Sequence, residues 1–126
     1  MNGVIVSNVT TLAAYAGPHA IPGIRFRAAR EPLGVSSWGM NVLELDAGCE
    51  LCPEHDHLKD DQEEVYVVLS GSVILRASGE ERVLVAGDMA RVAPEVRRKL
   101  VTREHPATVL ALGGTKGKPY TPSMGG

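Results

Sequence analysis

The sequence predicts an all-β domain, an antiparallel sandwich or barrel, and three observations support this class. Short runs rich in valine and leucine recur from Trp38 onward. Turn signals that contain glycine, proline, aspartate or serine separate these runs at close spacing. No long stretch shows the 3.6-residue apolar period of an amphipathic helix. Many short strands joined by frequent turns are typical of β-sandwiches and barrels.

The chain opens with a short irregular leader. Residues 8–16 predict one helical turn or a loop, with Thr10 or Thr11 as the N-cap. Two pairings of glycine with proline then interrupt the backbone. Residues 24–28 alternate apolar and basic side chains, which predicts an edge strand with its arginines facing solvent.

The barrel itself is expected at about 38–113, within a single domain that spans 1–126. Seven apolar runs predict strands, at 40–45, 65–69, 73–77, 82–85, 89–92, 96–102 and 107–112. Among the intervening signals, Ser70-Gly71 predicts a turn between the second and third of these runs. The stretch 114–126 is rich in glycine and proline and predicts a flexible tail.

Composition indicates an ordinary globular protein. The chain has 126 residues, enough for one domain with its own core. A net charge of -2 gives no basic surface for nucleic acid or an anionic membrane. No apolar run approaches the roughly 20 residues that span a bilayer. Cys49 and Cys52 are too few and too close together for a disulfide scaffold, so we expect reduced thiols and a cytoplasmic location.

Two histidines and a glutamate form a candidate metal site. His55 and His57 are one residue apart, so an extended backbone directs both side chains to the same face, from positions roughly 7 Å apart along the backbone. Glu64, at the start of the run 65–69, is best placed to supply a third ligand. Two histidines with one carboxylate suit Fe(II), and Mn, Ni and Zn also accept such ligands.

The stretch that contains these residues resembles the first motif of the cupin superfamily. That motif is a glycine, a His-x-His pair, a glutamate and a second glycine, and its places are taken here by Gly48, His55, His57, Glu64 and Gly71. Six residues separate His57 from Glu64 where the family commonly has three or four, so a short loop is expected at 58–63. The resemblance covers about 41–112.

The resemblance implies a double-stranded β-helix, the cupin or jelly-roll barrel, with a pocket between its two sheets. Cupins are commonly dimeric, so it also implies a homodimer. Members with a full ligand set include oxygenases, isomerases, decarboxylases and sugar epimerases, whereas others are storage or sensing domains. The family alone therefore does not fix a function.

The second cupin motif departs from the family at Arg98. When Gly87 is matched to the motif, Arg98 falls where the family has a fourth metal-binding histidine. Arg98 shares strand parity with Val96 and Leu100, which predicts that it points inward. A guanidinium cannot ligate a metal, and a buried one needs an anion. That anion is either Glu64 or the carboxylate of a substrate.

Strand parity adds two candidate ligand-binding residues to Arg98. Tyr66 shares the parity of Glu64, and Asn41 shares that of the inward-facing leucines that follow it. A rival metal site would use Cys49 and Cys52 with the two histidines as zinc ligands, although Cys52 has the opposite parity.

The sequence leads to two functional hypotheses. In the first, a small cupin binds a divalent metal and a small anionic metabolite, as in a metal-dependent oxygenase or isomerase. In the alternative, Glu64 and Arg98 pair with each other, and the barrel is a metal-free ligand-binding or sensing module.

Overall fold

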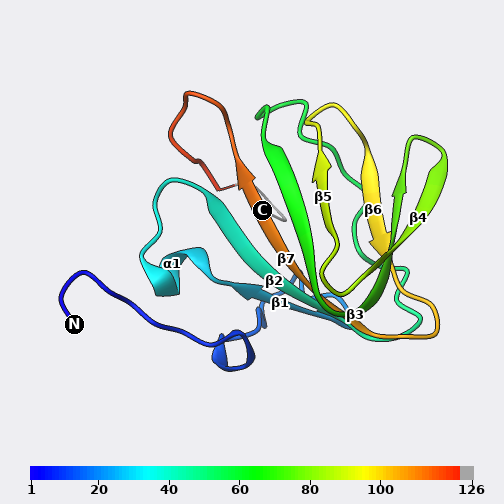
Figure 1. Ribbon diagram of the computed structural model, residues 1–126, viewed down its shortest axis with the longest axis horizontal. Coiled ribbons are helices and arrows are strands. Elements are labelled where there is room, and N and C mark those ends of the chain that lie inside the picture. The colour runs from blue at the N-terminus through cyan, green and yellow to red at the C-terminus, as the bar shows by residue number, and fades with distance from the viewer. Residues whose placement is uncertain (123–126) are drawn as a thin grey trace.

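The computed structural model describes residues 1–122 and confirms the all-β class. Every strand pair in it is antiparallel. The strands, labelled in Figure 1, are β1 Ile24–Ala28, β2 Gly39–Leu45, β3 Glu63–Ala77, β4 Glu80–Val85, β5 Met89–Val92, β6 Arg98–Val101 and β7 Ala107–Gly114. The helical elements are the 3-10 helix Val9–Thr11 and the one-turn helix α1 Arg30–Leu33. None of the helices in this part of the chain is long and apolar enough to cross a membrane.

Strand β3 organises the barrel because it takes part in both of its faces. The strand order is β1-β2-β7-β3-β4, and β5 and β6 also pair with β3. The first half of β3 pairs with β7 and β5, and its second half pairs with β4 and β6. Figure 1 shows the two groups of strands diverging from the region where they share β3. Inward-facing side chains from both groups form the main core, which includes Leu45, Tyr66, Val68, Val73, Leu84, Leu100 and Val109.

The predicted turn at Ser70-Gly71 is wrong, because β3 runs through it without a break. The register shifts between Val68 and Ser70, which marks a β-bulge. Gly71 has φ +73°, and a Cβ there would lie 1.9 Å from the backbone oxygen of Pro106. Glycine is therefore required for close passage of two backbones, at the point where β3 changes partners.

The N-cap prediction in the leader is also wrong. Asn8, rather than Thr10 or Thr11, caps the 3-10 helix, since its side chain accepts a hydrogen bond from the Thr10 N–H at 2.9 Å. Asparagine is among the best N-cap residues. Helix α1 was not predicted, since a single turn leaves no apolar period to detect. It ends at Gly34, which has φ +70°.

Strand β1 lies at the edge of the sheet, as predicted, but its two arginines differ. Arg25 is exposed, whereas the Arg27 side chain is 16% exposed. Arg27 donates hydrogen bonds to Glu44 and to the carbonyl oxygen of Leu12 in the leader. The leader therefore covers part of the expected solvent face of β1.

The segment that follows β7 packs against the end of the barrel next to Glu64. Tyr120 is 7% exposed and packs against Gly39, where a Cβ would lie 2.5 Å from its hydroxyl. The Thr115 hydroxyl donates a hydrogen bond to the carbonyl oxygen of Asp60 at 2.8 Å. Of the flexible tail expected at 114–126, the part up to 122 thus includes a buried tyrosine, and 123–126 lie outside the described residues.

Candidate metal centre and cavity

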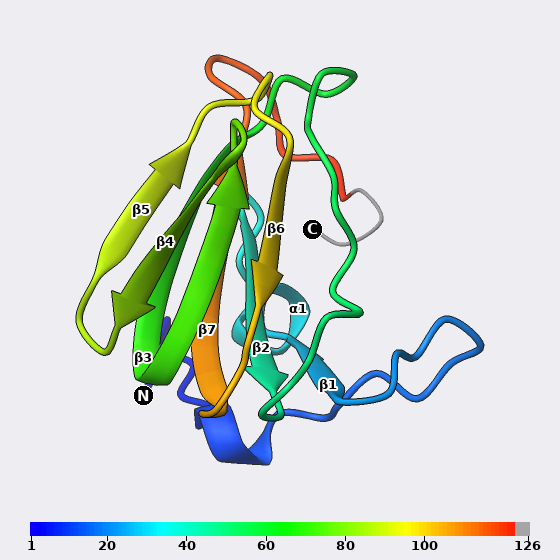
Figure 2. The same ribbon diagram turned by 90° about the vertical axis from the view of Figure 1, so that its right-hand side faces the viewer.

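The two histidines converge because the segment that joins β2 to β3 runs alongside β6, as Figure 2 shows. His55 and Arg98 form an antiparallel bridge, with N–H to O=C distances of 2.9 and 2.8 Å. The His57 N–H donates to the carbonyl oxygen of Pro94 at 2.8 Å. This extended backbone places both imidazoles on one face, with ring centroids 5.1 Å apart. Their predicted convergence is confirmed.

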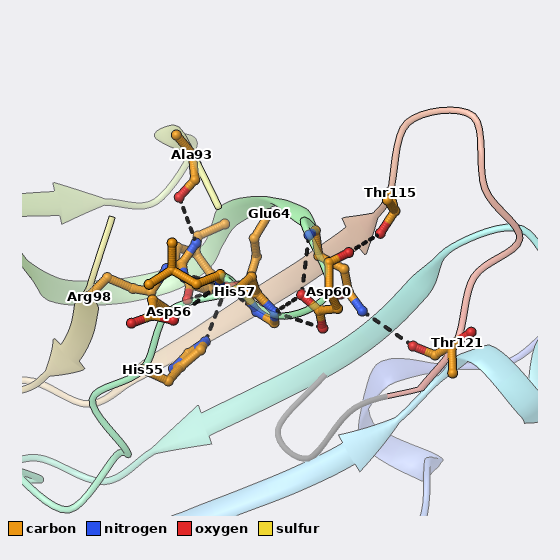
Figure 3. Close-up of polar contacts among 12 residues, drawn as sticks. His55, Asp56, His57, Asp60, Glu64, Ala93, Arg98, Thr115 and Thr121 are labelled. Atoms are coloured by element: carbon orange, nitrogen blue, oxygen red, sulfur yellow. Dashed lines mark hydrogen bonds and ion pairs between the residues drawn. The ribbon is translucent and has the colours of Figure 1, made fainter. Parts of the chain in front are cut away.

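Glu64 completes the cluster from the start of β3. Its Oε1 lies 3.6 Å from Nε2 of His55 and 3.9 Å from Nε2 of His57. The three possible ligand atoms all lie within 4.8 Å of one another (Figure 3). Glu63 is exposed and instead pairs with Arg91 at 2.9 Å, so the register that makes Glu64 the inward carboxylate is the one that was expected.

The hydrogen bonds of the two imidazoles leave their facing nitrogens available for a cation. Nδ1 of His55 lies 3.2 Å from the carbonyl oxygen of Pro53, and Nδ1 of His57 lies 3.0 Å from a carboxylate oxygen of Asp60. Both oxygens only accept, so Nδ1 carries the proton in each ring and Nε2 carries the lone pair in the neutral form. Each Nε2 is buried with no hydrogen-bond partner among the described residues, an arrangement that fits a divalent ion.

Electrostatics keep Glu64 ionised. Burial tends to raise its pKa, but interactions with His55 and with the Tyr66 hydroxyl, 2.5 Å away, hold the pKa below its usual value. Glu64 in turn raises the pKa of His55 against the opposing effect of burial. Burial and the nearby Glu64 charge raise the pKa of Tyr66 well above its usual value, so its hydroxyl remains a donor.

Arg98 points inward, as predicted, and is 0% exposed. Its Nε lies 3.8 Å from Oε1 of Glu64, and its Nη2 donates to the carbonyl oxygen of Ala93 at 3.4 Å. Nε and Nη1 have no hydrogen-bond partner among the described residues. Arg98 is not among the side chains that line the cavity, so its position is beside Glu64 and outside the cavity wall.

A cavity of about 590 Å³ opens beside the cluster. Its polar lining residues include Asn41 and Tyr66, two of the predicted ligand-binding residues, together with His55 and Glu64. The apolar lining residues that the strands and their neighbours contribute include Ile24, Phe26, Leu43, Leu100 and Ala111. Its volume lies within the range of roughly 300–1,000 Å³ that is usual for small-molecule sites.

The leader supplies cavity residues that the sequence did not indicate. Tyr15, His19, Ala20 and Ile21 line the cavity, although this segment was predicted only as a helical turn or loop followed by interruptions of the backbone. His19 is also exposed to solvent. A local sequence signal for this contribution is absent, because it depends on how the leader packs against the barrel.

Asp60 is a further site residue that the sequence did not indicate. A short loop was expected at 58–63, but Asp60 within it is part-buried and lies against His57. Asp60 follows His57 by three residues, and within a turn this spacing can bring the two side chains together. That spacing was the sequence signal for the contact. A carboxylate on the second nitrogen of a ligating histidine fixes the tautomer and the ring orientation.

Neither cysteine joins the candidate ligand group found among the described residues, so the rival four-ligand zinc site is not assembled. Cys49 is 6% exposed and packs in the main core. Cys52 lines the cavity, and burial raises its pKa to about 11, which keeps it a neutral thiol.

The protein resembles solved structures in its fold. No protein-family model and no curated protein matches the sequence. A cupin protein from Bacteroides fragilis superposes with a TM-score of 0.72 at 23% identity, covering 98% of this chain and 94% of that one. A cupin-superfamily sugar phosphate isomerase from Silicibacter pomeroyi gives 0.73 at 24% identity, with 86% and 74% covered. KdgF from Halomonas sp. gives 0.67 at 19% identity, with 90% and 94% covered.

At these identities the likeness concerns the path of the backbone. It extends over nearly the whole chain in the first of these pairs. Together with the antiparallel topology and the pocket at the barrel's interior, it identifies the architecture that the Gly48-to-Gly71 motif implied. The chain therefore has the cupin fold.

Proposed function

We propose that this protein binds a divalent metal ion through Nε2 of His55, Nε2 of His57 and the carboxylate of Glu64, and a small molecule in the adjoining cavity. The observation that carries the proposal is the pair of buried Nε2 atoms that face one ionised carboxylate without hydrogen-bond partners. A divalent ion bound there supplies a Lewis acid that polarises an oxygen-bearing ligand.

The chain's own groups hold this arrangement in place. Pro53 and Asp60 fix the two imidazoles through their Nδ1 atoms. The Tyr66 hydroxyl donates to Glu64 and so restricts the orientation of its carboxylate. His57, Glu64 and Tyr66 are buried, which strengthens the interactions among them.

The chemistry of such a site is compatible with a metal-dependent oxygenase or isomerase. The two-histidine, one-carboxylate set suits Fe(II), and Mn, Ni and Zn also accept these ligands. Among the structures of similar fold are a sugar phosphate isomerase and proteins described as DMSP lyases. These likenesses support small-molecule chemistry in the cavity without specifying the reaction.

Metal content tests the proposal directly. The protein is purified without a histidine tag, loaded with Mn²⁺ or Fe²⁺, desalted and measured by plasma mass spectrometry. We expect one ion per chain, lost in His55→Ala and in His57→Ala and retained in His105→Ala, which changes an exposed histidine. Loss of metal in Cys49→Ser and Cys52→Ser but not in the histidine variants would contradict the proposal.

A second function is favoured by one contact, the 3.8 Å approach of Arg98 Nε to Glu64 Oε1. In this alternative the two charges compensate each other, and the barrel holds a metabolite without a metal. A well-folded protein that takes up no metal at any loading would support it.

The homodimer and the cytoplasmic location remain predictions. The two free thiols are compatible with a reducing compartment.

A further inference from the structure

We propose that the cavity selects a molecule with one polar, oxygen-bearing head, which carries at most one negative charge, and an uncharged apolar body. This inference rests on the proposed function, because the metal would hold the head. It concerns the class of ligand, which the metal cluster alone does not define.

The strand register separates the cavity into a polar end and an apolar end. Asn41 pairs with Ala111 of β7, and Ala111 pairs with Tyr66 of β3, so these three lie in one row across the sheet. Glu64 lies two residues before Tyr66 on the same strand face, so the polar row and the metal cluster are adjacent.

The next rows on the same face are apolar. Leu43 follows Asn41 at a spacing of two residues and pairs with Phe26 of β1. Ile24 lies two residues before Phe26 and lines the cavity with it. A ligand whose head reaches the metal cluster therefore extends its body along hydrophobic side chains.

Charge gives an independent reason for a single anionic head. At the polar end, a divalent ion and Arg98 together carry three positive charges against two negative charges on Glu64 and Asp60, so one anionic head is favoured there. No lysine or arginine is among the described residues that line the cavity, and His19 is exposed. A second anion placed among Phe26 and Leu43 would be desolvated without a cation.

Isothermal titration calorimetry on the Mn²⁺-loaded protein, with simple carboxylates as probes, tests the inference. Acetate, butanoate and hexanoate share one head and differ in the apolar body. We expect affinity to rise about fourfold for each methylene, the value for transfer of a CH₂ out of water. Adipate has the length of hexanoate with a second carboxylate, and we expect it to bind at least about tenfold more weakly.

Three variants test which part of the cavity produces the effect. Phe26→Ala removes part of the apolar wall, and we expect it to weaken hexanoate severalfold while acetate is unchanged. Val83→Ala changes a β4 side chain that is 61% exposed and does not line the cavity, and it should leave both affinities unchanged. Leu43→Lys places a cation in the apolar end and should reverse the preference between hexanoate and adipate.

Equal affinity for acetate and hexanoate, adipate that binds as tightly as hexanoate, or no saturable binding of hexanoate at millimolar concentration would each overturn the inference. Failure of the proposed function is distinguishable, because metal uptake is measured before any carboxylate is added. A protein that takes up no Mn²⁺ contradicts the metal site, while the chain-length series on that metal-free protein still reports whether the cavity selects an apolar body.

Discussion

Asp60 lies 3.0 Å from Nδ1 of His57, on the opposite side of the imidazole from the nitrogen that faces Glu64 (Figure 3). The contact fixes the His57 tautomer without occupying the nitrogen that would bind a metal. The turn that contains Asp60 is itself held by Thr115, whose hydroxyl donates to the Asp60 carbonyl oxygen. The segment after β7 thus helps to position a residue of the metal cluster.

This relationship predicts the behaviour of Asp60→Asn. The amide still accepts a hydrogen bond from Nδ1–H but lacks the negative charge that stabilises a cation held by the opposite ring nitrogen, so Mn²⁺ affinity should fall about tenfold, and further in Asp60→Ala. Calorimetric titration with Mn²⁺ measures the change. Asp61→Asn is the matched control, because Asp61 is exposed and its φ of 56° is one that asparagine adopts readily. Equal losses in both variants would show that Asp60 acts only through the charge of the loop.

Metal affinity should depend on pH through His55. Glu64 raises the pKa of His55 above 6.5, and an imidazole must be neutral to ligate. Affinity for Mn²⁺ should therefore begin to fall at a pH above 6.5, before an ordinary histidine would protonate. Glu64 does not contribute in this range, because its pKa lies below 4.5. Titrations between about pH 5 and 8 test this, and an affinity that is constant down to pH 6 would contradict it.

The same shifts set the stability of the metal-free protein. The raised pKa of His55 adds stability below pH 6.5 that is lost as the pH rises through the folded-state value. The lowered pKa of Glu64 adds stability above pH 4.5 that is lost as the pH falls. Melting temperatures in EDTA should therefore be highest between these limits, whereas Mn²⁺ should stabilise most at higher pH. A melting temperature in EDTA that is lowest between pH 4.5 and 6.5 would contradict the directions of both pKa shifts.

The metal cluster could be predicted from the sequence because its geometry is mostly local. His55 and His57 are one residue apart on an extended segment, so their side chains share a face. Glu64 lies at the start of the strand that follows, and strand parity was therefore sufficient to group the three residues. The cavity wall was only partly predictable. Asn41 and Tyr66 follow from parity, but Tyr15 reaches the cavity through long-range packing of the leader, which leaves no periodic signal.

Asp60 and Gly71 show a second limit. The sequence identified a loop between His57 and Glu64 but not the curvature that returns Asp60 to the imidazole. Gly71 has a positive φ, which tight turns and β-bulges both use, so the residue alone does not distinguish them. Its contact with Pro106, on a segment distant in sequence, decides in favour of the bulge.

Arg98→Met separates the two functional hypotheses. The guanidinium of Arg98 lies 3.8 Å from Oε1 of Glu64 and would repel a cation bound there. If Glu64 ligates a metal, removal of the guanidinium removes this repulsion, and Mn²⁺ affinity should rise about tenfold. If Glu64 and Arg98 instead form a structural pair, the variant leaves an uncompensated buried carboxylate and should be destabilised by about 3 kcal/mol or more, with no metal uptake. Calorimetry and urea unfolding of the same preparation measure both quantities.

Gly71→Ala should destabilise the fold far more than Gly79→Ala. The two glycines have nearly equal φ, +73° and +76°, so alanine pays a similar conformational cost of about 1–2 kcal/mol at each. A Cβ at Gly79 meets nothing within 4 Å, whereas one at Gly71 lies 1.9 Å from the Pro106 oxygen. Because that oxygen belongs to the backbone, relief requires separation of β3 from the start of β7. Urea unfolding should show the difference, and equal losses in the two variants would mean that this close approach is absent in solution.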